Sequence, residues 1–71
     1  MTEYKSIDKF EIKGRGIVYC VEYKGETIYK SKGNNLVGSK VKIDGNEFTI
    51  KGVESYAIET ISDGHKIGLL V

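Results

Sequence analysis

The chain has 71 residues and a formal net charge of +1, with 39% hydrophobic and 30% charged residues. These values are typical of one small globular domain, and the near balance of charge argues against a protein that coats nucleic acid through many phosphate contacts. No apolar run approaches the roughly 20 residues of a membrane-spanning helix, and the N-terminus lacks a secretory pattern, so we expect a cytoplasmic protein with no membrane partner and no DNA.

Alternating apolar residues predict strands from the start of the chain. The first predicted strand covers residues 4–12 and ends with Phe10 and Ile12 on one face. The chain then turns at Gly14-Arg15-Gly16. The clearest strand covers residues 16–24, with its odd-numbered apolar residues on one face and its even-numbered residues on the other. A short extended segment at residues 27–29 and a polar loop at residues 30–35 follow.

The middle of the chain predicts a β-hairpin built from residues 36–43 and 47–51. A two-residue turn at positions 45–46 keeps the apolar residues of both strands on one face and pairs Ile43 with Phe48. The same register places Lys40 opposite Lys51. This pair is interpreted either as an anion site or as two lysines that extend into water.

Glycine marks the turns of the last third. Gly52 interrupts the alternation after Ile50, as a β-bulge would. Residues 56–61 continue extended, residues 62–65 turn, and the last strand faces inward at positions 67, 69 and 71. The whole pattern predicts an all-β fold, a small closed or nearly closed six-stranded antiparallel barrel made of one domain.

The residues with catalytic potential are few. His65 is the only histidine and Cys20 the only cysteine. A histidine in a turn is usually exposed and inert, and a cysteine in mid-strand is usually a small apolar filler. The acidic residues are scattered, and no phosphate-binding or metal-binding motif is present. We therefore expect no enzyme activity, no metal and no cofactor.

Two features favour binding. Gly14-Arg15-Gly16 is either a plain turn or an anion clamp of backbone N–H groups and the Arg15 guanidinium. Of the five tyrosines, Tyr19 and Tyr23 fit a core face. The tyrosines at positions 4, 29 and 56 are candidates for surface anchors at a protein interface or for base stacking.

Four blocks together resemble one known family. Residues 8–18, DKFEIKGRGIV, resemble the D-x-F-x-I-x-G-R-G-x-V opening of domain 2 of translational GTPases, the elongation factor Tu type barrel. Residues 37–43, VGSKVKI, are similar to its V-G-D-x-V-x-I segment. Residues 49–56, TIKGVESY, are similar to its T-x-x-G-V-E-x-F segment. Residues 64–71, GHKIGLLV, resemble its closing G-x-x-V-G-L-L-L.

The resemblance implies a translation-protein barrel and a surface near Phe10, Arg15 and Glu54 that faces the aminoacyl end of tRNA in elongation factor Tu. The sequence departs from the family at Ala57, where elongation factor Tu has a basic residue. It also departs at residues 19–21 and through an insertion at residues 30–35. No GTPase domain with its phosphate loop is present.

Two functions follow as expectations. The first is a non-enzymatic binding module that acts in protein–protein interaction or assembly. The alternative is binding of RNA or a translation component through the Phe10, Arg15 and Glu54 surface. The candidate binding residues are Phe10, Arg15, Lys40, Lys51, Glu54 and Tyr56.

Overall fold

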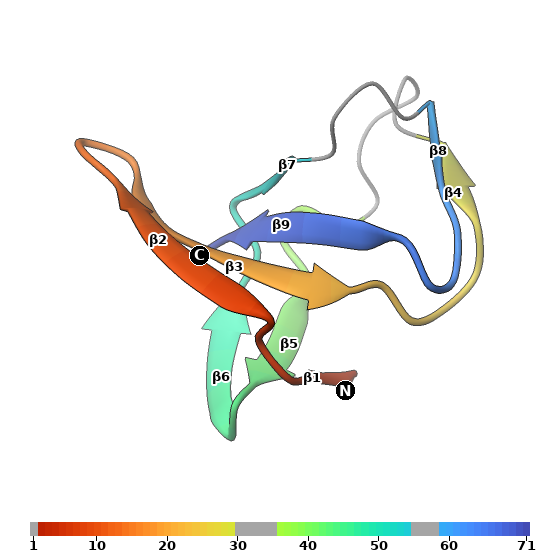
Figure 1. Cartoon of the computed structure of the whole chain (residues 1–71), viewed down its shortest axis with the longest axis horizontal. Helices are drawn as coiled ribbons and strands as arrows, with labels where there is room; N and C mark the ends of the chain where they lie inside the picture. The colour runs from red at the N-terminus through yellow and green to blue at the C-terminus, as the bar shows by residue number, and fades with distance from the viewer. Residues whose placement is uncertain (1, 30–35, 55–58) are drawn as a thin grey trace.

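The computed structural model describes residues 2–29, 36–54 and 59–71 and is all-β (Figure 1). No helix long and apolar enough to cross a membrane occurs among these residues. Within the same ranges the chain forms nine short strands: β1 Glu3–Tyr4, β2 Asp8–Ile12, β3 Gly16–Glu22, β4 Ile28–Tyr29, β5 Lys40–Ile43, β6 Asn46–Thr49, β7 Gly52–Glu54, β8 Thr60–Ile61 and β9 Lys66–Leu70.

These strands form three open sheets and not one closed barrel. The sheet orders are β1-β5-β6, β2-β3-β9-β7 and β4-β8. The chain changes sheet at residues 5–7 and at residues 50–51, and β2 and β7 are the edges of the four-stranded sheet. The antiparallel prediction also fails at one place, because β1 runs parallel to β5.

The predicted first strand is in fact two strands in different sheets. β1 pairs with β5 and β2 pairs with β3. Ser6, in the break, donates its backbone N–H to Asp44 Oδ1 at 2.9 Å and its hydroxyl to Asp44 Oδ2. These bonds fasten the break to the β5–β6 turn and hold the pKa of Asp44 below its usual range. Because the chain bends here, Tyr4 lies in the core and is only 4% exposed.

The β5–β6 hairpin has a different register from the predicted one. Asp44 and Gly45 have φ angles of 51° and 86° and form the two-residue turn, so Ile43 is opposite Asn46. An Asp-Gly pair takes positive φ at both central turn positions readily, which the twist of a hairpin favours. Phe48 is therefore opposite Val41 and still lies on the apolar face.

The shifted register removes the predicted lysine pair. Lys40 is opposite Thr49, and its Nζ lies 3.7 Å from Glu47 Oε1. The predicted pairing of Lys40 with Lys51, from which both interpretations of the lysine pair started, is therefore wrong.

Gly52 marks a change of sheet and not a β-bulge within one strand pair. Ile50 N–H still donates to Ser39 O in the hairpin at 2.9 Å, whereas Lys51 N–H donates to Leu70 O in β9 at 2.7 Å. β7 then begins at Gly52.

The core lies between the four-stranded sheet and the β1-β5-β6 sheet. Val21, Ile67 and Leu69 of the first pack in one cluster with Val41 and Ile43 of the second. The Tyr19 and Phe48 rings also meet across the layers, with centroids 5.3 Å apart. The prediction that Ile67 and Leu69 face inward is confirmed; Val71 is half-buried and packs against this cluster.

Candidate binding surface

One face of the four-stranded sheet contributes to the core, and the other points away from it. Residues opposite one another on neighbouring antiparallel strands point to the same side. Odd-numbered residues of β3 and β9 form the core face, and even-numbered residues form the other side, which we call the outer face. The outer face has four rows across the strands: Glu22 and Lys66; Asp8, Cys20, Gly68 and Glu54; Phe10, Val18, Leu70 and Gly52; Ile12 and Gly16.

An apolar groove of about 210 Å³ lies on the outer face. Its apolar walls include Ile7, Phe10, Val18 and Cys20. Gly68 lines the groove between them, and a Cβ built on Gly68 would come within 2.8 Å of Val18 Cγ1. The groove therefore depends on the missing side chain of a mid-strand glycine.

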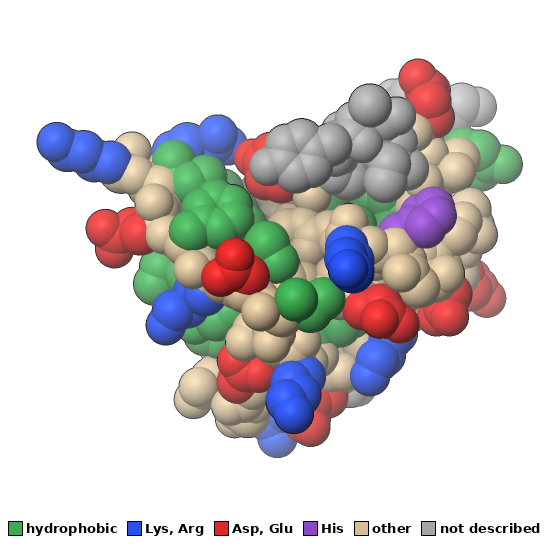
Figure 2. All heavy atoms as spheres, viewed as in Figure 1, with side chains coloured by type: hydrophobic (Ala, Val, Ile, Leu, Met, Phe, Trp, Pro, Cys, Tyr) green, Lys and Arg blue, Asp and Glu red, His purple; other side chains and the backbone are tan. Residues whose placement is uncertain are grey.

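Large apolar side chains stand exposed beside this groove. Phe10 is 43% exposed and Ile7 is 55% exposed. Val18, on the same face, is fully buried. Figure 2 shows hydrophobic side chains gathered over β2 and the adjoining sheet, between acidic and basic groups. An exposed aromatic residue above a packed apolar layer is typical of a docking surface.

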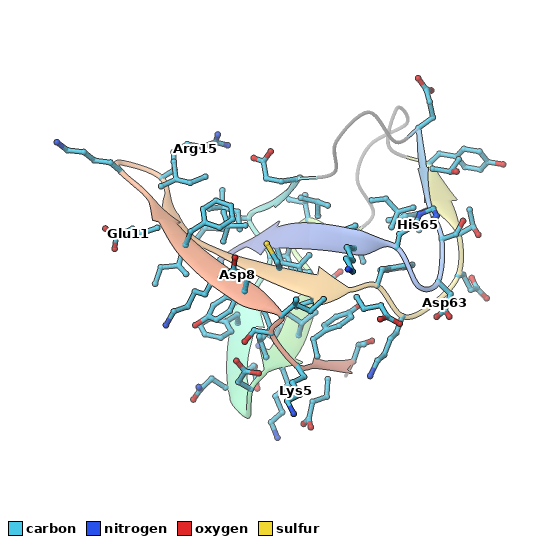
Figure 3. The ribbon with its side chains drawn as sticks, viewed as in Figure 1. Lys5, Asp8, Glu11, Arg15, Asp63 and His65 are labelled. Carbon is cyan, nitrogen blue, oxygen red and sulfur yellow. The ribbon has the colours of Figure 1, made fainter. Side chains whose placement is uncertain are left out.

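Charged groups surround the groove. Arg15 extends from the β2–β3 turn toward β7 (Figure 3), and its Nη1 lies 3.8 Å from Glu54 Oε1. Glu54 and Lys66 line the groove itself, and Asp8 shares a row with Cys20. This mixed rim leaves the outer face without a continuous positive field.

The hydrogen bonds between β3 and β9 fix the direction of the backbone groups in the sheet. Val71 N–H donates to Ile17 O at 3.0 Å, and Tyr23 N–H donates to His65 O at 2.7 Å. Odd-numbered residues of β3 thus bond with β9, and even-numbered residues direct their N–H and C=O groups toward β2.

The same alternation exposes backbone groups on the free side of β2. Residues 8, 10 and 12 are opposite the even-numbered residues of β3, so their backbone groups point into the sheet. Lys9 and Glu11 direct theirs outward, and the Glu11 side chain projects from this edge in Figure 3. Lys9 N–H donates to Asp8 Oδ1 at 2.8 Å, so a local side chain caps one of these donors.

The structure brings half of the predicted binding residues together. Phe10 and Glu54 line the groove, and Arg15 contacts Glu54. Lys40 lies in the β5–β6 hairpin and Lys51 at the crossing to β7. Tyr56 lies outside the described residues.

The predictions for the other tyrosines have mixed outcomes. Tyr4 is buried, so its prediction as a surface anchor is wrong. Tyr29 is exposed, as an anchor would be. Tyr23 is buried, and its hydroxyl donates to Glu26 O at 2.6 Å. Burial raises the pKa of both Tyr4 and Tyr23.

The two candidate catalytic residues lie in different elements, His65 in the turn before β9 and Cys20 in β3. His65 Nδ1 accepts a hydrogen bond from Ser62 N–H at 3.0 Å, which closes the turn before β9. Cys20 is half-buried in the groove. In the part of the chain that the structure describes, no three His, Cys, Asp or Glu residues gather closely enough to hold a metal ion.

Sequence reasoning missed Ile7 and the groove. The available signal was β3, whose apolar residues occupy both faces, from Val18 and Cys20 on one side to Tyr19 and Val21 on the other. A strand with two apolar faces in so small a chain indicates a second surface to cover.

No protein-family model matches this chain, and neither a curated protein nor a solved structure matches it.

Proposed function

We propose that this chain is a non-enzymatic binding module that acts in protein–protein interaction or assembly through the outer face. The observation that carries the proposal is the exposure of Phe10 and Ile7 beside an apolar groove on a sheet whose other face contributes Val21, Ile67 and Leu69 to the core. Protein interfaces combine such an apolar centre with a polar rim.

The charges of the outer face support a protein partner over a nucleic acid. Asp8, Glu22 and Glu54 supply three carboxylates to this face, whereas Lys66 supplies one ammonium group. Arg15 reaches the rim, but it already lies beside Glu54. A phosphate backbone needs uncompensated cations, and this face offers few.

One observation favours the alternative, binding of RNA or a translation component. Phe10, Arg15 and Glu54 lie along one surface, the set implied by the resemblance to domain 2 of translational GTPases. Under this alternative Phe10 stacks on a base and Arg15 contacts a phosphate. Titration with a short single-stranded RNA tests it. RNA binding that persists unchanged in Arg15→Ala and Tyr56→Ala contradicts it.

A comparison of two exposed apolar residues tests the protein reading. Phe10→Asp is expected to weaken capture of a partner protein from cell extract by about tenfold or more, the effect of removing a central aromatic anchor. Val37 is similarly exposed, at 48%, but lies outside the groove, so Val37→Asp is the matched control and should capture normally.

Circular dichroism checks that both variants fold. Capture should also survive ribonuclease treatment of the extract. A partner that both variants retain, or that ribonuclease releases, contradicts the proposal.

A further inference from the structure

The free edge of β2 has a charge pattern that is complementary to itself. Lys9 and Glu11 carry opposite charges two positions apart, and both lie on the side of the sheet opposite Phe10. In the described residues, β2 pairs with β3 alone and offers its other edge to solvent. Such an edge is a template for a further strand.

We propose that β2 pairs antiparallel with β2 of a second copy of this chain, about a two-fold axis at Phe10. The inference deepens the proposed function, on which it rests, by naming the partner of the surface around Phe10. The two four-stranded sheets then continue as one, and the two grooves become neighbours on one face. A two-fold contact of this kind uses the same patch on both copies.

Backbone geometry restricts the register. The outward N–H and C=O groups belong to Lys9 and Glu11, so these residues must occupy the hydrogen-bonded positions of the new pair. A shift by one residue would turn inward-facing backbone groups toward the partner strand and put the groove side of one copy beside the charged side of the other. Only shifts by two residues keep both the hydrogen bonds and the faces.

Charge then favours the register centred on Phe10 over the registers centred on its two neighbours in β2. With the axis at Phe10, Lys9 of each copy is opposite Glu11 of the other, which forms two opposite-charge pairs. An axis at Lys9 places two lysines in direct opposition, and an axis at Glu11 does the same with two glutamates. Like charges directly opposite one another destabilise a strand pair, and opposite charges stabilise it.

The apolar side of β2 gains from the same register. Phe10 takes a non-hydrogen-bonded position, where opposing side chains come closest, so the two Phe10 rings meet on the outer face. The exposed ring would thereby lose much of its contact with water. Charged residues on an edge strand usually prevent pairing; here their alternation disfavours the two registers centred on Lys9 and on Glu11.

One local contact opposes the pairing. Lys9 N–H is already satisfied by Asp8 Oδ1, so Asp8 must release it before Lys9 bonds to the second copy. This competition predicts a weak, concentration-dependent dimer and not a permanent one.

Charge reversal tests the register by analytical ultracentrifugation from micromolar to millimolar concentration. Wild type should show a monomer–dimer equilibrium. Glu11→Lys alone makes both pairs Lys–Lys, and Lys9→Glu alone makes both Glu–Glu. Each should raise the dissociation constant by about tenfold or more. An equimolar mixture of the two variants restores two opposite-charge pairs and should associate like wild type.

Two controls separate register from general charge. Glu26→Lys makes the same change of net charge as Glu11→Lys, but in the turn before β4, away from β2 (Figure 1), and should dimerise like wild type. Hydrogen exchange of the Glu11 amide should slow as wild-type concentration rises, because dimerisation buries that donor.

Three results would overturn the proposal: a wild-type monomer throughout the range, single variants that dimerise like wild type, or a mixture that associates no better than either variant alone. A monomer that still needs Phe10 to capture another protein would end self-pairing and leave the proposed function standing. The charge variants lie on the side away from the groove, so they leave its lining unchanged; Lys9→Glu also removes the contact of Lys9 Nζ with the Tyr19 ring, 5.8 Å from its centroid, so Glu11→Lys is the cleaner of the two variants.

Discussion

Both faces of the β2-β3-β9-β7 sheet carry apolar residues, but in the described residues a second sheet covers only one of them. On the core face, Val21 and Leu69 are covered by the β1-β5-β6 sheet and belong to one cluster with Val41 and Ile43. On the outer face, Val18 is equally buried, but it lines a groove whose wall includes the exposed Phe10.

This contrast shows that a residue can be buried although no second sheet covers the face on which it lies. Val18 is fully buried, whereas Phe10, which is opposite it on β2, remains exposed. A second layer makes the core face a determinant of stability. Among the described residues, no second sheet covers the outer face.

The largest expected effect is a difference in stability between alanine variants of two adjacent leucines in β9, Leu69 and Leu70. Leu69→Ala removes a fully buried side chain of the two-layer core and is expected to cost about 2–5 kcal/mol of unfolding free energy. Leu70 lies on the outer face, where neighbouring side chains and water can fill the space, so Leu70→Ala should cost about 2 kcal/mol, the low end of that range.

Urea denaturation measures both costs. Small domains have little stability to lose, so Ile67→Val, expected to cost about 1 kcal/mol, is the milder core variant if Leu69→Ala does not fold. Equal costs for Leu69→Ala and Leu70→Ala would contradict the contrast between the faces.

A smaller effect should come from filling the groove at Gly68. The added methyl group of Gly68→Ala would lie 2.8 Å from Val18 Cγ1 and 3.3 Å from Glu54 Cβ. Val18 is fully buried and cannot move aside freely, so we expect a cost of about 1–3 kcal/mol.

Gly52→Ala is the matched control for Gly68→Ala, because it lies in the next row of the same face. Its new methyl group would meet the flexible end of Leu70 at 3.4 Å, so it should cost less. Thermal unfolding of the two variants checks the order. If Gly52→Ala is the more damaging, the packing described for the groove is wrong.

The smallest expected effect is on stability at acidic pH. It concerns the hydrogen bonds from Ser6 to Asp44, which join the break after β1 to the β5–β6 turn. Hydrogen bonds from Ser6 lower the pKa of Asp44 from its ordinary value of 3.8. The stability from this carboxylate is therefore fully present above pH 3.8 and is lost as pH falls through the lower pKa of the folded state.

Asp44→Asn keeps a residue suited to the positive φ of the turn and removes the charge. It should flatten the loss of stability below pH 3.8, as should Ser6→Ala, which removes the hydroxyl donor. Unfolding midpoints measured at several acidic pH values give the slope. If the dependence of the unfolding midpoint on pH is unchanged in Asp44→Asn, the Asp44 carboxylate does not stabilise the β1-β5-β6 sheet through Ser6.

The sequence predicted the strands well and their partners poorly. Alternation at residues 16–22 and 66–70 is local and strong, so β3, β9 and the inward positions of Ile67 and Leu69 were foreseeable. The hairpin register was not, because a turn at 44–45 and one at 45–46 preserve the same parity. Only the backbone preference of Asp44-Gly45 separates the two turns.

The candidate site was predicted in part for a similar reason. Phe10 and Arg15 lie within one hairpin, so local sequence already places them near one another. Glu54 joins them through β9, and Ile7 through the break after β1, which are non-local events. Lys40 and Lys51 depended on a register that the fold does not use.

The sequence by itself determined an all-β chain, its main strands and the apolar character of both faces of β3, because these follow from side-chain alternation along a pleated strand. Tertiary structure alone decided which face was covered, where the chain changed sheet and that the sheets stayed open. These outcomes depend on which distant strands meet, and a one-dimensional pattern of apolar residues cannot specify that choice.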